Sequence, residues 1–86
     1  QGSWLVKSNA ETGEGYSDIS IQTPDRVGMV IELKYADDGN LEAACREALR
    51  RIEVKKYAEG LKYRGIKTII KYGIAFCGKE CMVMMA

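Results

Sequence analysis

The residues best suited to chemistry in this sequence are two carboxylates and a lysine: Asp18, Glu32 and Lys34. Glu32 and Lys34 stand two positions apart in a predicted strand, so their side chains point to the same face of the sheet. The preceding predicted strand, residues 16–22, reaches this one through the turn residues 23–27. If all five turn residues lie outside the strands, Asp18 is directly opposite Glu32, whereas a four-residue turn would place it on the other face.

Two like charges directly opposite each other destabilise a sheet by up to roughly 1 kcal/mol, so this predicted pair needs a compensating cation. The ammonium of Lys34 or a divalent cation would meet the need. The two carboxylates offer the hard oxygen ligands that Mg²⁺ takes, as does the backbone carbonyl of Ile31 or Leu33. Lys34 could then orient or deprotonate an attacking water, or stabilise the charge of a scissile phosphate. The alternative is a solvated strand face on which Glu32 and Lys34 form a local ion pair.

The composition excludes several familiar kinds of site. The 86 residues contain no His, so the chain holds no Ser-His-Asp triad, no Cys-His dyad and no His-ligated zinc. General acid–base chemistry falls to carboxylates, Lys or Tyr. Three Cys in a chain without a signal segment favour reduced thiols. No apolar run is long enough to span a membrane, so we expect a cytoplasmic protein that does not contact the bilayer.

The hydrophobic pattern predicts an α/β (α+β) domain with the element order β-β-β-α-β-β. The expected strands cover residues 4–8, 16–22, 28–35, 68–76 and 80–85. Asn40 is a good helix N-cap, and the apolar positions that follow it recur with helical spacing as far as Ile52. Helical character continues in the pattern through Leu61, and Gly65 suits the helix C-terminus.

This order implies a mixed sheet. The two strands that flank the helix should be parallel and joined by a right-handed crossover, while the earlier strands form an antiparallel meander. Only one face of such a sheet has a helix to cover it. Residues 1–3 are typical of a remnant of an expression tag, and we expect residues 4–86 to form one domain.

The near-zero net charge of +1 conceals a separation of charge along the chain. Residues 1–44 contain three basic and eight acidic residues, a net −5, and residues 45–86 contain ten basic and four acidic residues, a net +6. The basic half could hold phosphates of a nucleic acid, or it could form ordinary solvated helix charges. The candidate phosphate-binding residues are Arg46, Arg50, Arg51, Lys55 and Lys62.

An ordered series of short motifs resembles a known family. These are residues 8–19 (SNAETGEGYSDI), 31–36 (IELKYA), 55–61 (KKYAEGL) and 71–76 (KYGIAF). Together they are similar to the C-terminal domain of bacterial AAA-ATPase-like proteins, which belongs to the PD-(D/E)xK nuclease superfamily. The resemblance covers nearly the whole chain after residue 3.

This resemblance implies a restriction-endonuclease-like fold, a Mg²⁺ or Mn²⁺ site and hydrolysis of phosphodiesters in nucleic acid, DNA in particular. Carried over by position, Asp18 and Glu32 would bind the metal together with the Leu33 carbonyl. Lys34 would be the catalytic lysine. An ATPase domain would accompany this domain in the full-length protein.

The sequence departs from the family pattern in three respects. The helix that precedes the first strand of the family's core is absent, so the domain looks truncated. The exposed sheet face would then be covered by a second copy of the chain or by an exchanged strand or helix. Ser17 stands where the superfamily has Pro, and Arg51 stands where a Gln is expected. Glu11 and Glu14 could supply an auxiliary carboxylate, or they could belong to an acidic surface turn.

Three functions remain open at this level. The first is a metal-dependent nuclease-like hydrolase. The second is a catalytically inactive module that binds nucleic acid or regulates an AAA-type ATPase. The third is a bare interaction domain whose Glu32 and Lys34 form a surface pair.

Overall fold

Five strands form one mixed sheet in the order β1-β2-β3-β4-β5 in a computed structural model that describes residues 2–11 and 16–86, with side chains for 2–9 and 17–86. The strands are β1 (Leu5–Glu11), β2 (Tyr16–Gln22), β3 (Val27–Tyr35), β4 (Thr68–Cys77) and β5 (Glu80–Met85). The predicted restriction-endonuclease-like mixed sheet is confirmed. The first strand is longer than the pattern indicated, because the backbone of residues 9–11 pairs with that of residues 16–18.

The register of the central strands agrees with the prediction, because five residues separate the paired Gln22 and Gly28, although Val27 already belongs to β3 through its pairing with Thr68 of β4. Gln22 pairs with Gly28, so Asp18 lies directly opposite Glu32 in the antiparallel β2–β3 pair. Strands β3 and β4 are parallel, as expected for strands joined through a helical crossover. Gly73 of β4 is the parallel neighbour of Glu32.

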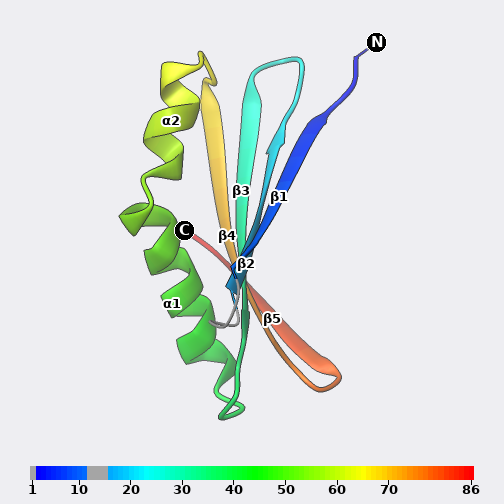
Figure 1. The fold of residues 1–86 in the computed structure, drawn as a ribbon, viewed down its shortest axis with the longest axis vertical. Helices are drawn as coiled ribbons and strands as arrows, with labels where there is room; N and C mark the ends of the chain where they lie inside the picture. The colour runs from blue at the N-terminus through cyan, green and yellow to red at the C-terminus, as the bar shows by residue number, and fades with distance from the viewer. Residues whose placement is uncertain (1, 12–15) are drawn as a thin grey trace.

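Two helices, α1 (Leu41–Val54) and α2 (Tyr57–Tyr63), lie on the same face of the sheet (Figure 1). The predicted N-cap is present, because the side-chain oxygen of Asn40 accepts a hydrogen bond from the backbone N–H of Ala43 at 3.1 Å. The predicted apolar stripe faces the sheet, and its buried members are Ala44, Cys45, Ala48 and Ile52. Neither of these helices, the two in the described part of the chain, is long and apolar enough to cross a membrane.

The helical region is interrupted, whereas the sequence pattern indicated one continuous helix. Lys56 adopts a left-handed backbone conformation with φ 57°, which ends the first helix and starts the second in a new direction. A non-glycine residue seldom adopts this conformation, because its Cβ crowds the following carbonyl. The interruption places Lys55 and Tyr57 at the junction between the helices.

Two small apolar clusters form the core, and Glu32 lies between them along β3. The first consists of Ala36, Ala44, Cys45 and Ala75, and the second of Val30, Ile52 and Leu61. Because side chains alternate along a strand, Val30, Glu32 and Ala36 all face the helices. The small side chains of the first cluster allow α1 to approach the sheet closely.

The face of the sheet opposite the helices carries no helix within the described residues (Figure 1). Alternation places only apolar, hydroxyl-bearing and thiol-bearing side chains there in the described parts of the strands. Several are large and exposed, among them Val6, Tyr35, Phe76, Val83 and Met85. The sequence-based expectation of an uncovered apolar face therefore holds for this chain on its own.

A substitution at Gly73 tests how closely α1 must approach the sheet. A Cβ at this position would lie 2.5 Å from the backbone oxygen of Cys45 and 2.9 Å from Cγ of Leu49. We expect Gly73→Ala to lower the free energy of unfolding by about 1–3 kcal/mol in urea titrations followed by circular dichroism. Gly60→Ala in α2 is the control, because no described atom lies within 4 Å of its Cβ. This control should be neutral or more stable by up to about 1 kcal/mol, and equal losses in both variants would contradict the packing argument.

Candidate active site

A pair of buried carboxylates lies at the centre of the candidate site. Asp18 of β2 is 6% exposed, and Glu32 of β3 is completely buried. The two residues are direct partners in the register, and both side chains project toward the helices. The structure therefore brings together the two carboxylates that the sequence analysis selected as metal ligands.

Cations from the helices neutralise this pair. Nε of Arg51 donates to Oε2 of Glu32 at 3.1 Å. Nζ of Lys55 lies 3.5 Å from Oδ2 of Asp18 and 3.8 Å from Oε2 of Glu32. Both cationic side chains are largely removed from solvent, with 21% and 23% of their surface exposed. The sequence analysis assigned these two residues to phosphate binding, and the structure places them on the carboxylates.

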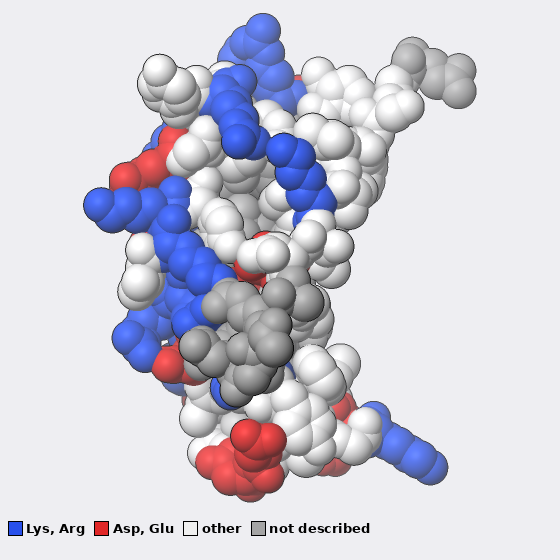
Figure 2. Space-filling view, in the orientation of Figure 1, with Lys and Arg blue, Asp and Glu red and all other residues white. Residues whose placement is uncertain are grey.

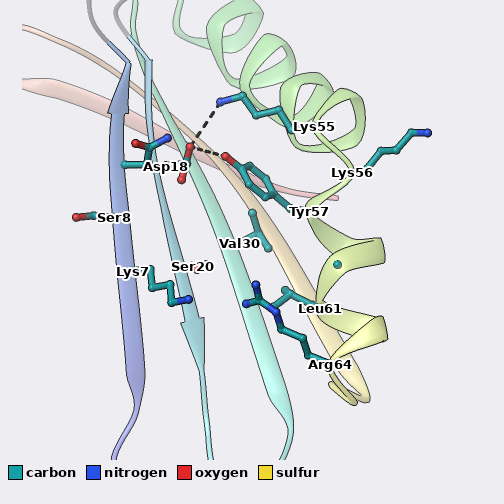
Figure 3. A pocket seen from close by; sticks show the side chains of 12 residues that line it. Lys7, Ser8, Asp18, Ser20, Val30, Lys55, Lys56, Tyr57, Leu61 and Arg64 are labelled. Carbon is teal, nitrogen blue, oxygen red and sulfur yellow. Dashed lines mark hydrogen bonds and ion pairs between the residues drawn. The ribbon is translucent and has the colours of Figure 1, made fainter.

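Tyr57 completes the contacts of Asp18. Its hydroxyl donates to Oδ2 of Asp18 at 2.6 Å, and Lys55 approaches the same oxygen (Figure 3). The left-handed Lys56 between these residues allows both Lys55 and Tyr57 to reach one carboxylate. The sequence analysis did not select Tyr57, because no local motif indicates its contact with Asp18.

Burial governs the electrostatics of the site. Desolvation raises the pKa of Glu32, the nearby charge of Asp18 raises it further, and the hydrogen bond from Arg51 opposes both effects. Desolvation also lowers the pKa of Lys55. The pKa of Tyr57 is raised, first by burial and then by its hydrogen bond to Asp18, so this hydroxyl remains a donor at neutral pH.

One oxygen of the pair is left without a partner. Oε1 of Glu32 is buried and forms no hydrogen bond with the described residues. A buried acceptor that lacks a partner costs about 1–3 kcal/mol, more when it is charged, so a bound ion, a water molecule or a functional role usually accounts for it. Two adjacent carboxylates with one unused oxygen offer the kind of oxygen ligands that divalent cations take in proteins. Among the described residues no third acidic, Cys or His side chain joins them in a metal-binding group.

Lys34 shares the helix-facing side of β3 with Glu32 but borders a different hollow. That hollow lies between the end of β3 and the start of α1, where Asp37, Asp38 and Glu47 also line it. The pKa of Glu47 is lowered mainly by its hydrogen bond from Arg50, with a smaller contribution from the charge of Lys34. The catalytic role of Lys34 stays a prediction.

The remaining sequence-based candidates are dispersed. Arg46 and Arg50 form ion pairs with Glu42 and Glu47 on the exposed side of α1. Lys62 is exposed on α2 and does not line the cavity beside Asp18. The side chain of Glu11 and all of Glu14 lie outside the described part of the chain. Leu33 points its side chain to the uncovered face, and the role of its carbonyl stays a prediction.

A cavity of about 490 Å³ opens beside the carboxylate pair, between α2 and strands β1 and β2. Asp18 lies at one end of it (Figure 3). Its basic lining residues are Lys7, Lys55, Lys56 and Arg64. Figure 2 shows Lys and Arg gathered along the helices and around a hollow in the upper half of this face. The sequence analysis did not select Lys7, because a lone lysine on an edge strand carries no local signal.

The raised pKa of Glu32 leads to a testable dependence of stability on pH. Since this pKa lies above its ordinary value of 4.5, the folded state binds the proton more tightly than the unfolded state. Glu32 therefore favours folding at low pH, and its contribution is lost as the pH rises through the folded-state pKa. We expect wild type to lose stability relative to Glu32→Gln as the pH rises above 4.5, in chelator-treated buffer.

Urea titrations at each pH measure this difference, and Glu80→Gln at the exposed start of β5 corrects for ordinary surface effects. A wild-type advantage over Glu32→Gln that grows with pH would show that Glu32 is stabilised as an anion, against the direction stated here.

Comparison with known proteins agrees with this geometry. The family model of the PD-(D/E)XK nuclease superfamily matches residues 1–86, which is the whole chain. No curated protein sequence gives a significant match. A match of this extent, together with the mixed sheet and the paired carboxylates on its central strands, places the chain in one family: it belongs to the PD-(D/E)XK nuclease superfamily.

Proposed function

We propose that this domain is a metal-dependent phosphodiester hydrolase that acts on nucleic acid, and on DNA in particular. Membership of the superfamily suggests a nuclease-like hydrolase, and nucleases of this superfamily generally use divalent metals. The observation that carries the proposal is the buried Asp18–Glu32 pair with its unpartnered Oε1, open on one side to a basic cavity.

In this proposal Asp18 and Glu32 hold Mg²⁺ or Mn²⁺, and the Leu33 carbonyl is a further candidate ligand. The bound cation would act as a Lewis acid on the scissile phosphate. Glu32 presents Oε1 while Arg51 fixes its other oxygen. Tyr57 holds Asp18 in place through its hydrogen bond. Lys34 would orient the attacking water or stabilise the charge that develops on phosphate.

A second function is favoured by one observation. Arg51 donates a hydrogen bond to Glu32, and it occupies the position where the family pattern is expected to have Gln. Together with Lys55, it already neutralises the carboxylate pair with protein cations. Such a pair can persist without metal. The second candidate is therefore a catalytically inactive module that binds nucleic acid or regulates an AAA-type ATPase to which it is attached.

The expected partners follow from the same proposal. The apolar sheet face supports a homo-oligomer, or coverage by an exchanged strand or helix, because large exposed side chains are concentrated on it. An ATPase domain in the full-length protein and a cytoplasmic location stay predictions from the resemblance and from the composition.

The first test separates metal binding from catalysis. Asp18→Asn and Glu32→Gln should abolish both the calorimetric signal of Mn²⁺ binding and the nicking of plasmid or single-stranded DNA. Lys34→Met should retain Mn²⁺ binding and reduce cleavage about 10²–10⁴-fold, the usual range for loss of a group that assists proton transfer. Lys79→Met, at the exposed β4–β5 turn, is the matched control. Wild type that neither binds Mn²⁺ nor cleaves DNA would leave the inactive module as the function.

The second test concerns the competing cations. Arg51→Gln removes a positive charge from Glu32, so we expect Mn²⁺ to bind about tenfold more tightly, a gain of ~1.4 kcal/mol. Lys55→Met should shift the affinity in the same direction. Arg46→Gln removes an equal charge from a solvent-exposed ion pair of α1 and should leave the affinity unchanged. Weaker Mn²⁺ binding in Arg51→Gln would mean that this arginine supports the metal-binding geometry instead of competing with the ion.

A further inference from the structure

Two cations face each other across the cavity at some distance from Asp18. Lys7 projects from β1 and Arg64 from the end of α2, and their side chains point toward one another over Ser20 (Figure 3). They lie far apart in the sequence and are brought together only by the fold.

These two cations differ from the other basic residues that line the cavity. Lys55 is held by the buried carboxylates, and the side chain of Lys56 points away from the cavity (Figure 3). Within residues 2–9 and 17–86, no carboxylate is bonded to Lys7 or Arg64. Two like charges in a concave surface raise the local potential and attract an anion that can accept hydrogen bonds from both.

Their position along the sheet matches one step of a nucleic-acid strand. Lys7 pairs with Ser20, and the pair two residues further along consists of Asn9 and Asp18. Two residues of an antiparallel strand span about 7 Å. This is the scale of the separation between successive phosphates in an extended single strand. A phosphate at Lys7 and Arg64 would therefore neighbour a phosphate at Asp18.

The size and lining of the cavity favour an unpaired strand. The cavity holds about 490 Å³, within the range of sites that enclose one small organic molecule. Val30 and Leu61 give it an apolar floor suited to a sugar or a base. The carboxylates of Asp18 and Glu32 are recessed, and Asp18 is only 6% exposed. A flexible single strand can enter such a recess, whereas stacked and paired bases hold a duplex backbone outside it.

We propose that this cavity binds a single, unpaired nucleic-acid strand, with Lys7 and Arg64 holding the phosphate next to the one at the carboxylate pair. The proposal rests on the proposed function for the identity of the second phosphate. It makes single-stranded nucleic acid the substrate class and makes Lys7 and Arg64 binding residues.

The test measures binding without cleavage. Fluorescence anisotropy with a labelled eight-nucleotide oligothymidylate in EDTA should show tighter binding than a duplex of the same length. The double variant Lys7→Met/Arg64→Met should bind this oligonucleotide at least tenfold more weakly at low salt. Its slope of log affinity against log salt should fall by about 0.7, the contribution of one phosphate contact in a single strand.

The control removes the same charge elsewhere. Lys67→Met/Lys79→Met alters two exposed lysines that do not line the cavity, and it should retain the wild-type slope. Equal weakening by the two double variants would overturn the proposal, because binding would then follow net charge alone. Duplex binding that is as tight as single-strand binding and equally dependent on Lys7 and Arg64 would also overturn it.

A failure of this proposal can be distinguished from a failure of the proposed hydrolase function. If the oligonucleotide binds through Lys7 and Arg64 but wild type shows no Mn²⁺ binding or cleavage, the strand site stands and the hydrolase proposal fails. If cleavage depends on Asp18 and Glu32 but is unaffected by Lys7→Met/Arg64→Met, the hydrolase proposal stands and the strand site fails.

Discussion

Two carboxylates that face each other inside the protein impose the main constraint on this fold. Asp18 and Glu32 are directly opposed on neighbouring strands, and almost no surface of either is exposed. Burial and mutual repulsion both oppose their ionisation. Removing one partner of a buried ion pair typically costs 3–5 kcal/mol. The arrangement is therefore tolerable only if the helices deliver cations and donors to this point, as Arg51, Lys55 and Tyr57 do.

The break between the helices satisfies this constraint. In an ideal α-helix Arg51 and Lys55 share one face because they are four residues apart, but Tyr57 would point about 120° away from Arg51 around the axis. The left-handed Lys56 changes the direction of the chain and returns Tyr57 to Asp18. The unfavourable backbone conformation of Lys56 is thus offset by a hydrogen bond to a buried charge.

The strands and their register follow from local information in the sequence. Alternating polarity defines β2, and the five residues between Gln22 and Gly28 fix the pairing of Asp18 with Glu32. The counter-ions of this pair do not follow in the same way. Helical periodicity identifies the buried face of α1. It does not identify where the helix lies over β2 and β3, because that placement depends on the close approach at Gly73. Nor does any residue pattern indicate that Lys56 is left-handed, so the contact of Tyr57 is inaccessible to sequence analysis.

The separation of charge along the chain is reflected in the carboxylate pair and its counter-ions. The acidic first half supplies Asp18 and Glu32, and the basic second half supplies the two cations that neutralise them. Two carboxylates and two cations give a neutral set, so a divalent cation added to it leaves an excess of positive charge in a poorly solvated recess. An anionic strand that enters the adjacent cavity would offset that excess. In the proposed mechanism the cation and the strand should therefore bind cooperatively, each reducing the electrostatic cost of the other.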